Sequence, residues 1–242
     1  MFNNSLVSII LPTYNEAGNI DKLIKTLIDQ LKFMGLSLKI IVVDDNSPDG
    51  TADKVSQLID QKLPVKLFIR KNQRGLATAI LHGITHSTGK IIVIMDTDFN
   101  HQPKDVPRLL KPIINNEADL VIGSRYIKGG GMHLTEAGTF QFLASKYGNL
   151  LVNKALLQLP INESLSGFLA FKRSIFKGLD LKKIFTGYGE YCISLLYNVY
   201  KKGFRINEVS VVYGKRQYGQ SKSKLLLMTI DYFKTAIKLK FF

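Results

Sequence analysis

Residues 91–98 read Ile-Ile-Val-Ile-Met-Asp-Thr-Asp, an apolar run that ends in two acidic residues. A run of this length, opened by Gly89-Lys90, is typical of a strand buried on both faces of a parallel sheet. Ligands of open α/β sheets bind beyond the carboxyl ends of such strands. Two carboxylates are costly to bury there unless they hold a cation, although Asp is also common in solvated turns. Residues 96–98 therefore predict either a cation site or a plain turn after the strand.

Apolar runs and amphipathic stretches alternate along the first half of the chain. Strands are predicted over residues 7–11, 39–43, 65–69, 91–95 and 120–123. Helices are predicted between them, over residues 16–33, 51–60, 75–86 and 106–114. This order predicts an α/β fold in which a mostly parallel sheet carries helices on both faces, joined by right-handed crossovers.

The pattern changes after residue 123. Gly129-Gly130-Gly131 predicts a flexible loop, because glycine has the widest choice of backbone conformations. Further helices are expected over residues 136–157 and 191–202, and further strands over residues 166–171 and 206–212.

The tail, residues 222–242, is predicted to be a basic amphipathic helix that follows a domain of residues 1–221. One face of this helix is apolar and consists of Leu226, Ile230, Phe233, Ile237 and Phe241. The pattern is typical of a helix that lies on a membrane surface, and also of a helix packed on its own domain. Two terminal phenylalanines with lysines close by favour the membrane surface.

Charge and composition narrow the class of protein. The 242 residues carry a net charge of +14, and residues 172–242 hold 15 Lys and Arg against 4 Asp and Glu. This distribution favours an anionic partner such as phosphates, acidic lipid or nucleic acid, unless it is only a lysine-rich solvated surface. A single cysteine excludes an internal disulfide framework and a cysteine-rich metal site. No signal peptide is expected at the start, and no stretch approaches the roughly 18 apolar residues of a membrane span.

Polar residues follow three of the predicted strands. Asp44-Asp45 ends the second strand as Asp96 and Asp98 end the fourth, and residues 12–16 after the first read Pro-Thr-Tyr-Asn-Glu. Neither a Gly-x-Gly-x-x-Gly fingerprint nor a phosphate-binding P-loop is present. A nucleotide would therefore be held through a cation that bridges its phosphates, and Mg²⁺ or Mn²⁺ suits such oxygen ligands.

Five stretches together carry a resemblance. They are Pro12–Glu16 (PTYNE), Asp44–Thr51 (DDNSPDGT), Met95–Pro103 (MDTDFNHQP), Gly123–Tyr126 (GSRY) and Arg216–Lys222 (RQYGQSK). In this order, over about residues 6–225, the chain resembles the polyprenol-phosphate (dolichol-phosphate) mannose synthases, which are family 2 glycosyltransferases of the GT-A fold. The first two stretches alone would indicate only the wider family of glycosyltransferases.

The resemblance implies roles for particular residues. Those expected at the nucleotide sugar are Pro12, Tyr14, Glu16, Val43, Asp44, Asp45, Met95, Thr97, Arg216 and Lys222, the last two in a loop that closes over the diphosphate. Asp96 and Asp98 are expected to bind the metal with Asn100, and Arg125 to meet the acceptor phosphate. His101 is expected to have a structural role rather than to bind the metal.

The activity that the resemblance implies is inverting transfer of mannose from GDP-mannose to a polyprenol phosphate, with Mg²⁺ or Mn²⁺. The location it implies is peripheral, at the cytoplasmic face of a membrane, with a small membrane-anchoring subunit as a further partner. A glucosyltransferase that uses UDP-glucose is the alternative within the same fold. The alternative of another class is a non-catalytic basic module that binds nucleotide sugars or nucleic acid.

Overall fold

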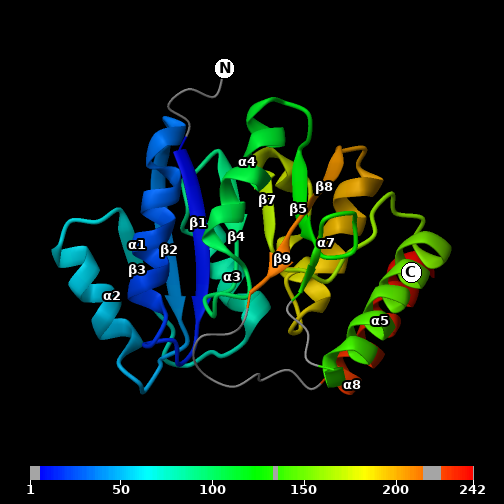
Figure 1. The fold of residues 1–242 in the computed structure, drawn as a ribbon, viewed down its shortest axis with the longest axis horizontal. Helices are drawn as coiled ribbons and strands as arrows, with labels where there is room; N and C mark the ends of the chain where they lie inside the picture. Colours follow the sequence, from blue (N-terminus) through cyan, green and yellow to red (C-terminus); the bar gives the residue numbers. More distant parts are fainter. Residues whose placement is uncertain (1–5, 133–135, 215–224, 242) are drawn as a thin grey trace.

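The computed structural model describes residues 6–132, 136–214 and 225–241. Its centre is a seven-stranded sheet in the order β3-β2-β1-β4-β7-β5-β8 (Figure 1). The strands are β1 (Leu6–Thr13), β2 (Ser37–Asp44), β3 (Val65–Ile69), β4 (Ile91–Ile94), β5 (Leu120–Ser124), β7 (Leu169–Lys172) and β8 (Ile206–Ser210). Only β7 runs antiparallel to its neighbours, β4 and β5, so the predicted mostly parallel sheet is confirmed.

Helices cover both faces of the sheet (Figure 1). On one face lie α1 (Ile20–Leu31), α2 (Thr51–Asp60) and α4 (Val106–Ile114). On the other lie α3 (Leu76–Thr85), α6 (Leu181–Ile184) and α7 (Glu190–Lys201). Short 3₁₀ turns complete the chain at Lys32–Met34, Pro103–Asp105 and Arg173–Phe176, and a small second sheet pairs β6 (Gly131–Met132) with β9 (Val212–Tyr213).

The strands inside the sheet are mostly apolar because each face meets a helix layer, whereas the edge strands β3 and β8 carry polar residues such as Lys66 and Glu208. In β1, Val7, Ile9 and Leu11 pack with the layer of α1, α2 and α4, while Ile10 packs with the layer of α3 and α7. Successive side chains of a strand point to opposite faces, so a strand covered on both sides has no position for an exposed polar residue. Polar side chains therefore gather where the strands end.

Several predicted elements differ from those observed. The strand expected over residues 166–171 begins at Leu169, the strand expected over residues 206–212 is divided between β8 and β9, and Gly131 of the predicted glycine loop lies in β6. Helix α1 begins at Ile20 rather than at residue 16, because the Glu16 carbonyl accepts the N–H groups of Asn19 and Ile20 in a turn that precedes it. The helix predicted over residues 136–157 is α5 (Glu136–Leu150) followed by a π-helix, η3 (Leu151–Leu156).

The tail forms the helix α8 (Leu225–Phe241), which contacts α7 and η3 (Figure 1). Tyr232 and Ala236 are buried against that layer. Ile230, Ile237 and Phe241 remain 45%, 48% and 67% exposed. The helix therefore has both an inner face that packs on its own domain and an outer apolar face. None of the helices within the described ranges is both long and apolar enough to cross a bilayer.

Candidate active site

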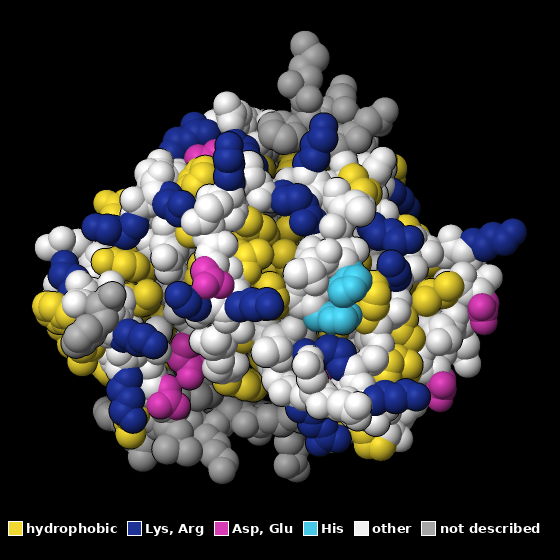
Figure 2. Space-filling model, turned by 180° about the vertical axis from the view of Figure 1, so that it is seen from behind, with side chains coloured by type: hydrophobic (Ala, Val, Ile, Leu, Met, Phe, Trp, Pro, Cys, Tyr) yellow, Lys and Arg dark blue, Asp and Glu magenta, His cyan; other side chains and the backbone are white. Residues whose placement is uncertain are grey.

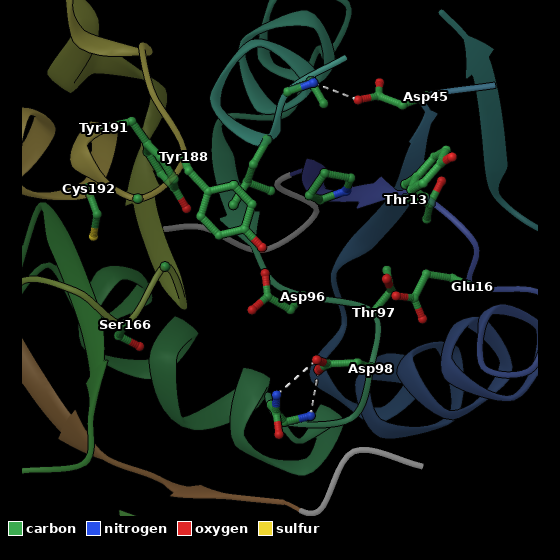
Figure 3. Close-up of a pocket in the computed structure, with 18 of the residues that line it drawn as sticks. Thr13, Glu16, Asp45, Asp96, Thr97, Asp98, Ser166, Tyr188, Tyr191 and Cys192 are labelled. Carbon is green, nitrogen blue, oxygen red and sulfur yellow. Dashed lines mark hydrogen bonds between the residues drawn. The ribbon is translucent and has the colours of Figure 1, made fainter. Parts of the chain in front are cut away.

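A cavity of about 420 Å³ opens at the carboxyl ends of β1, β2 and β4 (Figure 3). Its walls bring together most of the residues predicted from the sequence, namely Pro12, Tyr14, Glu16, Asp45, Asp96, Thr97, Asp98, Asn100 and Arg125. Arg216 and Lys222 lie outside the described residues. The convergence expected from the strand order is therefore present in space.

Val43, Asp44 and Met95 do not reach the cavity wall and are fully buried. The Asp44 carboxylate accepts hydrogen bonds from the Thr13 hydroxyl at 2.9 Å, from the Ser47 hydroxyl at 2.6 Å and from the Ser47 N–H at 2.7 Å. Asp44 thus joins the ends of β1 and β2. Val43, Asp44 and Met95 were expected at the nucleotide sugar, and the structure places them behind the wall of this cavity rather than on it.

Asp45 does line the cavity, and it is held by a buried cation that the sequence did not single out. Arg70 donates from Nε to the Asp45 carboxylate at 2.7 Å, and the Gly75 N–H donates to it at 2.9 Å. The Arg70 side chain is 4% exposed and that of Asp45 is 9% exposed. A carboxylate so enclosed needs such partners, and they fix its direction at the cavity wall.

The loop after β4 presents the two aspartates in different ways (Figure 3). The Asp96 side chain is 45% exposed, whereas Asp98 is almost completely buried. Asp98 accepts hydrogen bonds from the N–H and the side-chain amide of Asn100, both at 2.9 Å. The loop is tightly wound, since Phe99 has a left-handed φ of 65°. Asn100 turns its amide nitrogen toward Asp98, so only its Oδ1 is left as a possible metal ligand.

These oxygen donors fit a hard divalent cation. Mg²⁺ commonly takes one or two carboxylates from the protein and the rest of its ligands from substrate phosphates and water. Among the described residues no cluster of three or more His, Cys, Asp or Glu forms a complete metal cage. Asp96 and Asp98 at a cavity wall therefore match a site completed by a bound diphosphate, rather than a structural metal site.

His101 lies behind Asp96 and is completely buried. Its Nδ1 accepts the Asp96 N–H at 2.8 Å, so Nδ1 carries no proton and the neutral ring is protonated on Nε2. Burial lowers the pKa of His101 to about 4, which keeps the ring neutral near pH 7. The expected structural role of His101 agrees with this arrangement.

Arg125 stands at the opposite wall from the nucleotide-side residues and is paired with a buried acid. Its Nε donates to the Glu163 carboxylate at 2.7 Å and its backbone N–H donates at 2.5 Å. The guanidinium carbon lies 4.5 Å from the Tyr213 ring centre and 4.9 Å from that of Tyr126. Burial raises the pKa of the Glu163 carboxyl, and the Arg125 guanidinium partly offsets that rise. Arg125 is thus fixed in direction before any ligand binds.

Several wall residues were not predicted from the sequence. They are Arg74, Gly75, Leu76, Ala79, Leu165, Ser166, Gly167, Tyr188, Gly189, Tyr191, Cys192 and Tyr213, in addition to Thr13. Arg74 covers the Tyr14 ring at 4.5 Å, an arrangement that follows from the turn before α3. In the view of Figure 3 the Tyr188 side chain points toward Asp96. The sequence indicates these residues only by their position after a strand or before a helix, and many residues outside the cavity share such a position.

Comparison of the sequence with known proteins identifies the family to which this chain belongs. The family model described as "Glycosyl transferase family 2" matches residues 8–179. The dolichol-phosphate mannosyltransferase of Pyrococcus furiosus is 36% identical over 220 residues, which is 90% of this chain and 59% of that protein. The undecaprenyl-phosphate mannosyltransferase of Micrococcus luteus is 32% identical over 217 residues, covering 88% of this chain and 85% of that protein. The chain thus spans well under two thirds of the Pyrococcus furiosus relative.

Solved structures share the fold. Glucosyl-3-phosphoglycerate synthase from Mycobacterium tuberculosis, in complex with Mn²⁺, UDP and glucosyl-3-phosphoglycerate, aligns with a TM-score of 0.70 at 21% identity. The alignment covers 99% of this chain and 81% of that one. The same enzyme has also been solved with Mg²⁺ and UDP, at a TM-score of 0.70. The predicted GT-A fold is confirmed, and the neighbours that share it were crystallised with divalent metal and nucleotide.

Proposed function

Because this chain belongs to glycosyl transferase family 2, we propose that it transfers mannose from GDP-mannose to a polyprenol phosphate. The observation that carries the proposal is the cavity with two kinds of wall: carboxylates on the side of β1, β2 and β4, and Arg125 at the end of β5. The acidic wall suits a nucleotide diphosphate held through a cation, and the arginine suits a second anion. The named relatives supply the sugar and the lipid class.

On the donor side, Asp96 and Asp98 would hold Mg²⁺ or Mn²⁺. When bound, the cation would neutralise charge that develops on the departing diphosphate. Asp45, fixed by Arg70 and Gly75, and Tyr14, covered by Arg74, form the part of the wall where the nucleoside would lie. Asp44 supports this wall from behind.

On the acceptor side, Arg125 would bind the lipid phosphate. A phosphate monoester is already ionised at neutral pH, so it needs no general base to act as a nucleophile. His101 agrees with this, because its ring is neutral, buried and engaged by the Asp96 N–H. A single displacement by the phosphate oxygen would invert the anomeric carbon and give a β-linked sugar phosphate lipid.

The donor can be tested against its rivals in one assay. The protein is incubated with a short polyprenol phosphate, Mn²⁺ and either radiolabelled GDP-mannose or radiolabelled UDP-glucose. Label in the lipid extract is expected from GDP-mannose. Label from UDP-glucose alone would contradict the proposed donor and support the glucosyltransferase alternative.

The non-catalytic alternative has a separate signature. On the face drawn in Figure 2, Lys and Arg side chains are dispersed rather than gathered into one groove. Nucleic-acid binding through such charges would weaken steeply with salt. No transfer from either donor, together with tight and salt-sensitive DNA binding, would support this class instead.

We also propose that the outer surface of α5, η3 and α8 rests on the membrane that holds the acceptor. Leu143, Tyr147, Leu150 and Leu151 are 42–63% exposed on the first two elements, and the outer residues of α8 are 45–67% exposed. Lys146, Lys154, Lys234 and Lys238 are exposed on the same helices. Exposed apolar side chains with exposed lysines on the same helices suit an interface with acidic lipid headgroups. Tyr126, which faces Arg125, also donates from its hydroxyl to Ser145 of α5 at 2.8 Å, so this surface adjoins the acceptor wall.

Substitution of exposed residues tests this surface. Leu151→Ser combined with Ile237→Ser should lower flotation with vesicles of acidic lipid by about tenfold, since each apolar side chain gains about 1.5–3 kcal/mol when fully buried. Phe33→Ser is the matched control, because Phe33 is 86% exposed on the turn after α1. Equal flotation of all three proteins would refute the surface. Truncation of the tail is a poorer test, because it would also remove the buried Tyr232 and Ala236.

A further inference from the structure

A continuous chain of contacts crosses the floor of the cavity from the metal loop to the acceptor wall. It begins at the Asp96 N–H, which donates to His101 Nδ1 at 2.8 Å. His101 Nε2 lies 2.9 Å from the Tyr213 hydroxyl and 3.0 Å from the Ser166 carbonyl oxygen. On its other side, the Tyr213 ring supports the Arg125 guanidinium at 4.5 Å. Within this chain of contacts, Tyr213 is therefore the residue that contacts both His101, on the side of the metal loop, and Arg125, on the acceptor wall.

The geometry points to Tyr213 as a positioning residue for both substrates: its hydroxyl sets the metal loop through His101, and its ring sets Arg125. This inference rests on the proposed function, and it concerns a residue that touches neither reacting group.

The hydroxyl of Tyr213 is enclosed by fixed partners. It donates to the Ser166 carbonyl oxygen at 2.9 Å and lies 2.8 Å from the Ser166 hydroxyl. With Oη–H directed to Ser166, the oxygen can accept from His101 Nε2–H. Together with the Ser166 carbonyl oxygen, which lies 3.0 Å from Nε2, this bond holds the histidine in the tautomer whose Nδ1 faces the Asp96 N–H. The Phe168 ring, stacked on His101 at 4.7 Å with an interplanar angle of 10°, keeps the imidazole in its plane.

The ring of Tyr213 contacts the Arg125 guanidinium on the acceptor wall. A cation over a tyrosine face gains energy from the ring quadrupole, and the gain is larger where water is excluded. Tyr213 is 9% exposed, and its backbone is tied into β9, which pairs with β6. Arg125 is thus braced by Glu163 at its donors and by Tyr213 at its face.

The two contributions can be separated by substitution. Tyr213→Phe removes the hydroxyl and keeps the ring, so it should disturb the metal loop only. Tyr213→Leu removes both. Tyr232→Phe is the control, because Tyr232 is also buried and its hydroxyl also bonds backbone carbonyls, of Ser164 and Gly189, but it does not line the cavity.

The first measurement is the dissociation constant of Mn²⁺, determined by electron paramagnetic resonance in the presence of saturating GDP. Tyr213→Phe should raise the dissociation constant of Mn²⁺ about tenfold, the size expected when a partner behind a metal ligand is lost. Tyr232→Phe should leave it within about twofold. Adding Tyr213→Phe to His101→Phe should raise the constant no further than His101→Phe alone, since non-additivity marks residues that act in series.

The second measurement is the KM for a short polyprenol phosphate. It should stay within about twofold in Tyr213→Phe and rise about tenfold in Tyr213→Leu. An unchanged Mn²⁺ constant in Tyr213→Phe, or an equal change in Tyr232→Phe, would overturn the inference while the wild-type activity stands. Wild-type protein that binds no Mn²⁺ with GDP and transfers no mannose would instead overturn the proposed function, and this inference with it.

Discussion

Replacing Asp98 with alanine should lower the rate of mannose transfer by about 100- to 1000-fold. The carboxylate is proposed to hold the cation that stabilises the departing diphosphate, and loss of one such electrostatic group commonly lowers the rate 10²–10³-fold. The fold should be retained, because Asp98 lies in the loop after β4 at the cavity wall and accepts hydrogen bonds from Asn100 of the same loop. The measurement is lipid-extractable label from GDP-mannose at saturating Mn²⁺.

Two further variants sharpen this result. Asp98→Asn keeps the shape of the side chain and removes its charge, so it should lose as much activity as the alanine variant. Asp105→Asn is the control, since Asp105 is also buried and follows the same loop, yet binds Arg108 away from the cavity. It should keep transfer within about twofold. An active Asp98→Asn would contradict the role of the charge.

Replacing Arg125 with methionine should lower the free energy of unfolding by about 3–5 kcal/mol, because Glu163 would remain buried without its cation. The Glu163 side chain is fully buried and that of Arg125 is 14% exposed, so solvent screens the pair little. The measurement is urea unfolding at several pH values.

The pH dependence of this loss has a definite sign. Burial already raises the pKa of Glu163, and removal of Arg125 should raise it further. A carboxyl whose pKa is higher in the folded state stabilises the fold when protonated, and that stability is lost as pH rises through the folded pKa. The deficit of Arg125→Met should therefore be small near pH 4–5 and largest at pH 7–8.

A double variant is the control for this prediction. Arg125→Met with Glu163→Gln leaves a neutral amide that can still accept the backbone N–H of residue 125. It should recover more than half of the deficit at pH 7.5. A single and a double variant of equal stability at that pH would show that the lost energy comes from packing rather than from the unpaired charge.

Most of the sheet could be predicted from the sequence, because strands buried on both faces consist of consecutive apolar residues. The runs around Ile9, Ile41 and Val93 fall within β1, β2 and β4. The start of α1 could not be predicted, since it is set by a turn around Glu16 rather than by periodicity. The antiparallel direction of β7 could not be predicted either, because a short apolar strand can pair in either direction with its neighbours, here β4 and β5.

Some residues of the candidate site could be predicted from the sequence, and others could not. Asp45, Asp96 and Asp98 were predicted because each follows a strand at the same edge of the sheet, whereas Arg125 was expected only from the resemblance carried by residues 123–126. Glu163 was not, because its partnership with Arg125 spans 38 residues and depends on a loop held by Glu208.

Asp44 shows the reverse case. Asp45 lines the cavity, whereas Asp44, the last residue of β2, is buried and bonds to Thr13 and Ser47. A residue pair such as Asp44-Asp45 therefore indicates a site but does not say which member serves it.

The central claim is that a divalent cation at Asp96 and Asp98 ties a sugar diphosphate to the edge of the sheet. Titration calorimetry of GDP-mannose into the protein, with Mn²⁺ and then with EDTA, tests it most directly. Binding is expected with Mn²⁺, with a loss of at least about tenfold in affinity in EDTA and in Asp98→Asn. Equal affinity with and without the cation, or no heat of binding in either case, would contradict the account.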